Sequence, residues 1–344
     1  MEHKKTRTNN LFAEEFRLDK ISGQNDPLIK LNKRIVWEKF RALLNGALNQ
    51  GAKGAGGCRP YDYVMMFKIL ILQRYYNISD DKTEFAILDR LSFMRFLGLT
   101  LSDRVPDAKT IWYFREKLIK AGLIEKLFEL FQTELKEKGL IANQGKMIDA
   151  SFVEVPIQRN TKEENEQIKH GEKPNKWKEN PHKMVQKDTD AKWTKKNDTD
   201  YFGYKNHVKA DEESKIIDSY VVTDASVHDS QVIEQLVTEQ DTGQPLYADS
   251  AYSGEPIAQS ISKAQMINCI HEKGYRNRPL SKEQKEKNRI KSKTRARVEH
   301  IFGFIENSMN GSYIRTIGIK RATAVIGLMN LTYNMFRYIQ LTPQ

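Results

Sequence analysis

The spacing of apolar residues changes near Gly145, and this change limits the possible folds more than any other feature of the chain. Upstream, apolar residues recur every three or four positions, which predicts amphipathic helices. These predicted helices span residues 34–48, 62–76, 80–97, 108–121 and 124–138. Downstream, segments rich in β-branched and aromatic residues predict strands at 146–155, 201–210 and 215–223. The sequence therefore predicts an all-helical region followed by an α/β region.

Short helices and strands alternate through the rest of the chain. We expect helices at 229–239, 254–263, 294–309 and 321–339, and extended segments at 246–249 and 266–271. This order of elements predicts a mixed central sheet. Residues 158–200, between the first two strands, are charged and irregular, and we interpret them as an insertion. The predicted organisation is a polar N-terminal arm at 1–30, a helical domain at 31–140 and an α/β domain at 141–344 that contains the insertion.

The charge balance points to a polyanionic partner. The 344 residues include 56 Lys and Arg against 45 Asp and Glu, a formal net charge of +11, so nucleic acid is the first expected partner. Two cysteines, Cys58 and Cys269, are too few for a disulfide framework or a zinc cluster. The start of the chain has no apolar signal-peptide segment, and no apolar run approaches the roughly 18 residues of a membrane span. The expected location is the cytoplasm, in association with the nucleoid.

Three acidic residues occupy positions where a charge is unexpected unless it serves a site. Asp149 interrupts the apolar strand MIDAS, and Asp249 ends the short strand in YADSAY. Ligand sites in α/β sheets gather at the carboxyl ends of strands, which suits both aspartates. Glu299 borders the apolar stripe of the predicted helix 294–309.

Carboxylates of this kind suit a pair of hard divalent cations. Phosphodiester hydrolysis by two metal ions needs oxygen ligands that hold the ions roughly 3.5 to 4 Å apart. Asp149, Asp249 and Glu299 are therefore candidate catalytic residues and metal ligands. The expected cofactor is two Mg²⁺ ions, for which Mn²⁺ could substitute. A structural interpretation stands beside this one: Asp149 and Asp249 would be cap and turn residues, and Glu299 would pair with Arg295 on a helix surface.

Six motifs follow one another in the C-terminal half of the chain. They are MIDAS, DAKWTKK, YFGYKNHVKAD, VHDS, YADSAYSG and RARVEHIFGF. Together with the upstream segments GGCRPYDYVMMFKIL and PDAKTIWYFREKL, they resemble the transposases of bacterial insertion sequences, specifically the insertion-sequence-five branch of the DDE superfamily. The resemblance implies a ribonuclease H-like core, Mg²⁺ dependence and catalytic roles for Asp149, Asp249 and Glu299.

The residues around Glu299 depart from one pattern of related transposases, a Tyr, Arg, Glu, Lys signature. Arg295 occupies the arginine position, but Ser292 and Glu306 stand at the tyrosine and lysine positions. The sequence therefore lacks the lysine from which the phosphate contact is expected, and another basic residue could make that contact instead. The candidates are Lys291, Lys293 and Arg297.

A strongly basic segment, residues 273–297, directly precedes Glu299. It contains 11 Lys or Arg and two Glu, a local net charge of 11 − 2 = +9. Such a segment could neutralise several phosphates, or it could be a solvated loop. The candidate DNA contacts are Trp177, Trp193, Lys195, Lys196, Lys291 and Lys293. Each tryptophan could stack on an unpaired base or anchor the insertion to the core.

Other polar residues are candidates for supporting the carboxylates or for contacting phosphate. Lys205 and His207 alternate along a predicted strand and share one face. His228 could act there or simply cap a helix. Arg295 and Arg297 complete this set. The N-terminal helices could include a helix-turn-helix with 108–117 as the recognition helix, or they could form a dimer interface.

These expectations describe a transposase that hydrolyses double-stranded DNA at its element's terminal inverted repeats and transfers the 3′-hydroxyl into target DNA. By analogy with the superfamily, a homodimer should act on the DNA. A ribonuclease H-like nuclease or resolvase, which cuts without joining, is one alternative. A non-catalytic DNA-binding descendant is another, against which the intact carboxylates argue.

Overall fold

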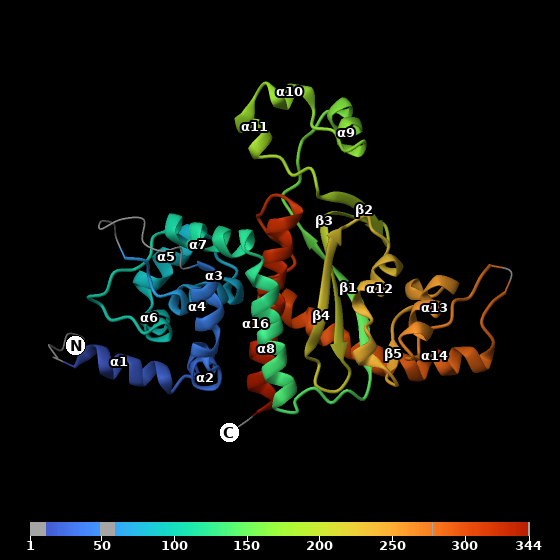
Figure 1. The fold of residues 1–344 in the computed structure, drawn as a ribbon, viewed down its shortest axis with the longest axis horizontal. Helices are drawn as coiled ribbons and strands as arrows, with labels where there is room; N and C mark the ends of the chain where they lie inside the picture. The colour runs from blue at the N-terminus through green and yellow to red at the C-terminus, as the bar shows by residue number, and fades with distance from the viewer. Residues whose placement is uncertain (1–11, 49–58, 277, 343–344) are drawn as a thin grey trace, which may run out of the picture. The chain divides into compact units, whose positions relative to one another are not determined.

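The computed structural model describes residues 12–48, 59–276 and 278–342; residues 1–11 of the predicted arm and Cys58 lie outside this part of the chain. Contacts between residues divide the chain into two compact units (Figure 1). The first comprises Met1–Gln73 and Ile78–Leu118, and the second comprises Arg74–Asn77 and Ile119–Gln344. Among the described residues, no helix is long and apolar enough to cross a membrane.

The described part of the first unit is helical, as the sequence predicts. Its helices are α1 (Ala13–Ser22), α2 (Pro27–Arg34), η1 (Trp37–Phe40), α3 (Arg41–Leu48), α4 (Tyr63–Tyr76), α5 (Asp80–Asp89), α6 (Leu91–Leu97) and α7 (Ala108–Lys120), with the last residues of α4 and α7 in the second unit. The segment expected to be an irregular polar arm forms α1 and the start of α2, where Asp26 accepts a hydrogen bond from the Leu28 amide at 2.9 Å. Arg90 adopts an extended conformation and divides the predicted helix 80–97 into α5 and α6. Aromatic rings in contact form part of the core: Trp37, Phe40, Phe67 and Phe96.

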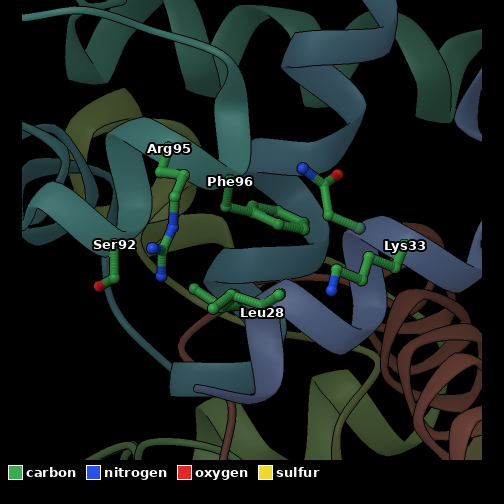
Figure 2. A pocket seen from close by; sticks show the side chains of 7 residues that line it. Leu28, Lys33, Ser92, Arg95 and Phe96 are labelled. Atoms are coloured by element: carbon green, nitrogen blue, oxygen red, sulfur yellow. The ribbon is translucent and has the colours of Figure 1, made fainter. Parts of the chain in front are cut away.

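A pocket of about 240 Å³ lies between α2 and α6 of this unit (Figure 2). Leu28 and Phe96 supply apolar lining. Arg95, also in the lining, donates a hydrogen bond to Ser22 Oγ at 2.8 Å and forms an ion pair with Asp26 at 3.0 Å. Its guanidinium therefore joins α6 to the end of α1 and the start of α2.

The second unit contains a six-stranded mixed sheet. Its strands are β1 (Lys146–Glu154), β2 (Lys192–Lys196), β3 (Thr199–Asp211), β4 (Ile217–Asp224), β5 (Pro245–Tyr247) and β6 (Ile267–Asn268). β3 pairs antiparallel with β1, β2 and β4, whereas β5 pairs parallel with both β1 and β6. The order β4, β3, β1, β5, β6 is that of a ribonuclease H-like core, so the predicted fold class is confirmed.

Helices cover both faces of this sheet. On one face, α8 (Leu123–Glu137) and α16 (Ile319–Leu341) lie side by side (Figure 1). Asn330 of α16 exchanges amide hydrogen bonds with Asn206 of β3 at 2.8 and 3.0 Å, so both buried amides have partners and the register of α16 is fixed. On the other face, α12 (Ile233–Leu236) and α13 (Glu255–Lys263) enclose an apolar cluster. Its members include Ile148, Leu236, Leu246, Tyr252 and Ile257.

The insertion between β1 and β3 forms a small helical subregion beyond the ends of β2 and β3 (Figure 1). Its helices are α9 (Lys162–Lys169), α10 (Asn175–Lys178) and α11 (Pro181–Val185). Trp177 is fully buried among them and donates a hydrogen bond to Glu164 at 2.6 Å. At the end of the insertion, Asp188 accepts hydrogen bonds from the Tyr204 hydroxyl at 2.7 Å and the Gly318 amide at 3.1 Å. The insertion is therefore fastened both to β3 and to the start of α16.

The helix expected at 294–309 begins earlier. It consists of α14 (Lys282–Arg295), η5 (Ala296–Val298), α15 (Glu299–Gly303) and the π-helical turn η6 (Phe304–Ser308). Ser281 and Gln284 form a capping box that starts α14, although α14 has no buried residue. Much of the basic segment 273–297 is therefore helical rather than a loop.

Candidate active site

Asp149 lies within β1, opposite Val208 of β3. Its side chain is 17% exposed, and its carboxylate accepts a hydrogen bond from the Ala150 amide at 2.8 Å. Burial raises the pKa of this carboxyl group to about 6; Asp249 adds to the increase and Arg295 opposes it. The strand therefore holds a carboxylate where it is poorly hydrated.

Asp249 follows β5, the parallel neighbour of β1. The strands pair Lys146 with Leu246 and Met147 with Tyr247, and continuing that register by two residues aligns Asp249 with Asp149. The Asp249 carboxylate accepts a hydrogen bond from the Ala251 amide at 2.6 Å. This contact fits the structural interpretation of Asp249 as a turn residue, and it leaves other lone pairs of the carboxylate for a ligand.

Arg295 connects the first carboxylate to the third. Its guanidinium donates to Asp149 at 3.0 Å and to Glu299 at 3.1 Å. The Glu299 side chain is 62% exposed, much more than that of Asp149. Both carboxylates thus lie within reach of one planar cation, while Asp249 is close enough to affect the charge of Asp149.

The chemistry of the three carboxylates suits a divalent metal, but in the described arrangement the three do not converge on one point. Among residues 12–48, 59–276 and 278–342, no group of three or more His, Cys, Asp or Glu is arranged to hold a metal ion. Glu299 is turned to Arg295. Asp249 adds to the cost of ionising Asp149, and a cation between the two carboxylates would remove that cost. The chemistry of the donor set therefore fits a hard cation, and Glu299 would have to turn away from Arg295 to join the two aspartates.

Two family models match the chain. Residues 16–117 match the model described as Transposase domain (DUF772), and residues 143–335 match the Transposase DDE domain, which covers 335 − 143 + 1 = 193 of the 344 residues. The chain belongs to the DDE transposase family. It is therefore an enzyme that cleaves DNA and transfers strands, and the insertion-sequence-five branch is compatible with these matches. A similar solved structure, a cryo-EM structure of the piggyBac transposase synaptic complex with hairpin DNA, has a TM-score of 0.44 and 11% identity over 92% of this chain and 75% of that chain.

Lys205 and His207 of the transposase lie on the same face of β3, and both are buried. Lys205 Nζ donates to the Val227 carbonyl at 2.7 Å and pairs with Asp229 at 2.8 Å. His207 Nε2 is hydrogen-bonded to Thr223 Oγ1 at 2.9 Å, and burial lowers the pKa of His207 to about 4. His207 is therefore neutral at pH 7, and both side chains hold neighbouring segments together.

His228 is the N-cap of η2 (Asp229–Val232), the first part of the helix expected at 229–239. Its Nδ1 accepts a hydrogen bond from the Ser230 amide at 3.3 Å and lies 2.7 Å from the Ser230 hydroxyl. These contacts favour the capping interpretation of His228.

A row of polar contacts connects α14 to the segment after β6 and to β1. The contacts are Gln284 to Glu272, Asn288 to the Glu272 carbonyl, Lys291 to the Ile270 carbonyl, Ser292 to His271 and Arg295 to Asp149. Apart from the adjacent Lys291 and Ser292, the contacting helix residues follow one another at intervals of three or four, so they share one face of α14. Polar contacts therefore position the helix that carries Arg295.

The basic residues considered as substitutes for the signature lysine differ in their surroundings. Arg297 donates to the Glu212 carbonyl at 3.1 Å, and Lys293 is exposed. Lys291, by contrast, lines a cavity that also borders Tyr252. Glu306 is exposed on η6.

The two tryptophans of the insertion have opposite environments. Trp193 on β2 is 52% exposed, and its ring packs against Phe202 with 5.0 Å between centroids. Trp177 has no exposed surface. Trp193 can therefore stack on a base, whereas Trp177 packs inside the insertion, where it contacts Glu164, Lys183 and Lys187 rather than the core.

The lysines of β2 flank Trp193. Lys195 pairs with Asp198 at 3.2 Å and remains well exposed. Lys196 lies over the Phe152 ring at 5.7 Å and is close enough to Asp149 to lower the pKa of its carboxyl group. Of the two, Lys196 has the clearer connection to the carboxylates.

Three residues of this region were not predicted: Asp229, Tyr252 and His271. The Tyr252 hydroxyl is buried without a hydrogen-bond partner among the described residues, and burial, with Asp229, Asp149 and Asp249, raises the pKa of Tyr252 far above its usual value. His271 belongs to none of the six motifs. Asp229 and Tyr252 do lie in motifs, VHDS and YADSAYSG, and this was the sequence signal that could have identified them.

Helix α7, the possible recognition helix, exposes an aromatic and basic face. Trp112 and Tyr113 are 46% and 55% exposed, and Lys117 Nζ lies 4.8 Å from the centre of the Tyr113 ring. The connection from α6 to α7 contains ten residues, 98–107, which is longer than the three- or four-residue turn of a helix-turn-helix. Both the DNA-binding and the dimerisation interpretation of this helix stay open.

Proposed function

We propose that this transposase cuts double-stranded DNA at the terminal inverted repeats of an insertion sequence and joins the released 3′-hydroxyl to target DNA, with Mg²⁺ as cofactor. The observation that carries the proposal is the position of Arg295, which contacts Asp149 and Glu299 while Asp249 lies beside Asp149. Carboxylates from a strand, a strand end and a helix thereby come to one region. This is the donor chemistry that two-metal phosphoryl transfer requires.

Asp149, Asp249 and Glu299 would hold the metal. Two bound Mg²⁺ ions, or Mn²⁺ in their place, would activate the attacking hydroxyl and stabilise the leaving oxygen. The protein's own residues prepare this region by keeping Asp149 poorly hydrated and by pairing it with Arg295. Because a guanidinium has five N–H donors, Arg295 can also contact a DNA phosphate.

The DNA would run past the basic residues of β2 and α14. Lys196 lies near Asp149, and Trp193 offers an exposed ring beside it. Lys195, Lys291 and Lys293 are further proposed contacts on these two elements. Lys205, His207, His228 and Arg297 are proposed to support the site, because each is engaged with neighbouring protein groups.

The remaining organisation is proposed by analogy with the superfamily. Residues 31–140 would form a domain for DNA binding or dimerisation, after an arm at 1–30. Residues 141–344 would form the catalytic domain with the insertion at 158–200. A homodimer would bring two element ends together, in association with the nucleoid.

The test uses Asp149→Asn in the full-length protein with a duplex that carries the terminal repeat found beside the gene. We expect Mg²⁺-dependent cleavage and strand-transfer products from the wild type and neither from the variant, with DNA binding retained. Cleavage by Asp149→Asn at the wild-type rate would overturn the assignment. Wild-type cleavage without joined products would instead indicate a nuclease or resolvase, and terminal-repeat binding without cleavage would indicate a non-catalytic protein.

A further inference from the structure

A cavity of about 390 Å³ opens beside the candidate active site, between α13, the segment after β6 and α14. Its polar lining includes Asn268, His271, Glu272 and Lys291. The backbone amide of His271 donates to the Ala248 carbonyl at 3.1 Å, which places this segment directly beside the residue that precedes Asp249. The cavity therefore lies close to Asp249, although none of the three carboxylates lines it.

Lys291 supplies the positive charge of this lining. One of its three N–H groups donates to the Ile270 carbonyl at 2.8 Å, which fixes the side chain toward the cavity and leaves two donors for a ligand. The one acidic residue of the lining, Glu272, is engaged by the Gln284 amide. The cavity thus offers a lysine ammonium group whose position is fixed and which has two N–H donors for a ligand.

His271 and the start of α13 add to the suitability for an anion. His271 Nε2 lies 3.3 Å from the hydroxyl of Ser292, the residue after Lys291. This contact fixes the imidazole ring of His271 beside Lys291. Gly254 and Ile257, at the start of the nine-residue helix α13, also line the cavity. A helix start presents amide N–H groups and the positive end of the helix dipole.

We propose that Lys291, with His271 as a positioning residue, binds a backbone phosphate of the DNA next to the scissile bond. This contact would replace the one expected from the signature lysine, whose position Glu306 occupies. Lys293 and Arg297 do not fill this role, since Lys293 is exposed outside this lining and Arg297 donates to the Glu212 carbonyl. The inference rests on the proposed function, because it assumes that the scissile DNA lies at Asp149 and Asp249.

The test measures binding of terminal-repeat DNA without divalent metal, for duplexes in which each phosphate near the cut is replaced in turn by a neutral methylphosphonate. For the wild type, one such replacement should weaken binding by about tenfold, as expected for the loss of a hydrogen bond to a charged group. Lys291→Gln keeps a donor for the Ile270 carbonyl but removes the charge. It should bind unmodified DNA about tenfold more weakly and show no further loss with that one methylphosphonate.

The matched control is Lys293→Gln, which makes the same change of charge on the same helix. This control should retain the tenfold effect of the methylphosphonate, and Lys291→Arg should recover much of the lost affinity. If Lys291→Gln keeps the wild-type loss at every substituted phosphate, the proposed contact is wrong. Because no metal or cleavage is needed, this outcome is distinguishable from failure of the proposed function, which would appear as absent cleavage by the wild type with Mg²⁺.

Discussion

The candidate active site joins two regions that are held in different ways. Asp149 lies in β1, which pairs with β3 on one side and β5 on the other. Glu299 follows α14, a helix without buried residues that is positioned by polar contacts. Their side chains are 17% and 62% exposed. One carboxylate is therefore fixed by the sheet, whereas the other is exposed at the start of α15, directly after a helix that only polar contacts hold in place.

This difference separates two roles within the carboxylate set. Burial makes ionisation of Asp149 unfavourable, so a cation bound beside it would stabilise the ionised carboxylate. Glu299 is already well hydrated and loses less when it reorients. Arg295 contacts both carboxylates and is the connection between the two regions. Substitutions of these three residues should therefore have different signatures.

The largest expected effect is on DNA cleavage by Asp149→Asn and Glu299→Gln. Each should lower the rate of Mg²⁺-dependent cleavage on the order of 10³-fold or more, because each removes a proposed metal ligand. Single-turnover cleavage of terminal-repeat DNA measures this. A large loss in only one of the two variants would show that the other carboxylate is not a ligand.

Arg295→Ala should have the next largest effect, a fall in cleavage of about 10²-fold. Arg295 opposes the rise of the Asp149 pKa, so its removal should raise that pKa above about 6. The acid limb of kcat/KM against pH should consequently move to higher pH. Arg297→Ala is the control, since Arg297 donates to the Glu212 carbonyl, and an unmoved acid limb in Arg295→Ala would contradict the coupling.

A smaller effect is expected on the free energy of unfolding without metal, which should differ between variants of Asp149 and Glu299. The pKa of Asp149 is raised to about 6 in the folded protein, from an ordinary value of 3.8. The folded state then binds more protons than the unfolded state between these values, and stability falls as the pH rises through this window. Asp149→Asn should therefore be more stable than the wild type at pH 8, on the order of 2 kcal/mol, but not at pH 3.

Urea unfolding at both pH values, without divalent metal, measures this difference. Glu299→Gln, which changes an exposed side chain, should unfold like the wild type at either pH within about 0.5 kcal/mol. A destabilised Asp149→Asn at pH 8 would show that burial is not what raises the pKa of Asp149.

The smallest expected effect concerns α14 alone, the helix that precedes Glu299. Ser281→Ala removes one side of the capping box of α14, which should cost about 1 kcal/mol of local stability. Amide hydrogen exchange within α14 should become about fivefold faster, while exchange in β1 stays unchanged. Equal acceleration in both elements would show that they open together.

Much of the fold was predictable because its apolar patterns are strong. The predicted strand 146–155 and helix 321–339 correspond to β1 and α16 within one or two residues. Weaker patterns gave larger differences. Polar caps start both α2 and α14, and an apolar pattern cannot detect α14 because this helix has no buried residue.

The candidate site was predicted less completely. Asp149 and Asp249 stand out because a charge follows apolar residues, and their motifs carry a family resemblance. His271 and Tyr252 become neighbours of this region only through the parallel pairing of β5 with β1 and β6. Their importance depends on distances across the sheet, which the order of residues does not reveal. The exposure of the two tryptophans was equally invisible, since Trp177 and Trp193 lie in similarly charged surroundings in the sequence.

The spacing of the contacts on α14 has a consequence for how this chain can vary. Residues at 284, 288, 291, 292 and 295 face the protein, whereas Lys285, Lys287, Arg289 and Lys293 are exposed. Deleting one residue between these contacts would rotate the rest of the helix by about 100° and carry Arg295 away from Asp149. The outward lysines and arginine can therefore be replaced without breaking these contacts. A change in the length of this helix, in contrast, would break the contact between Arg295 and Asp149.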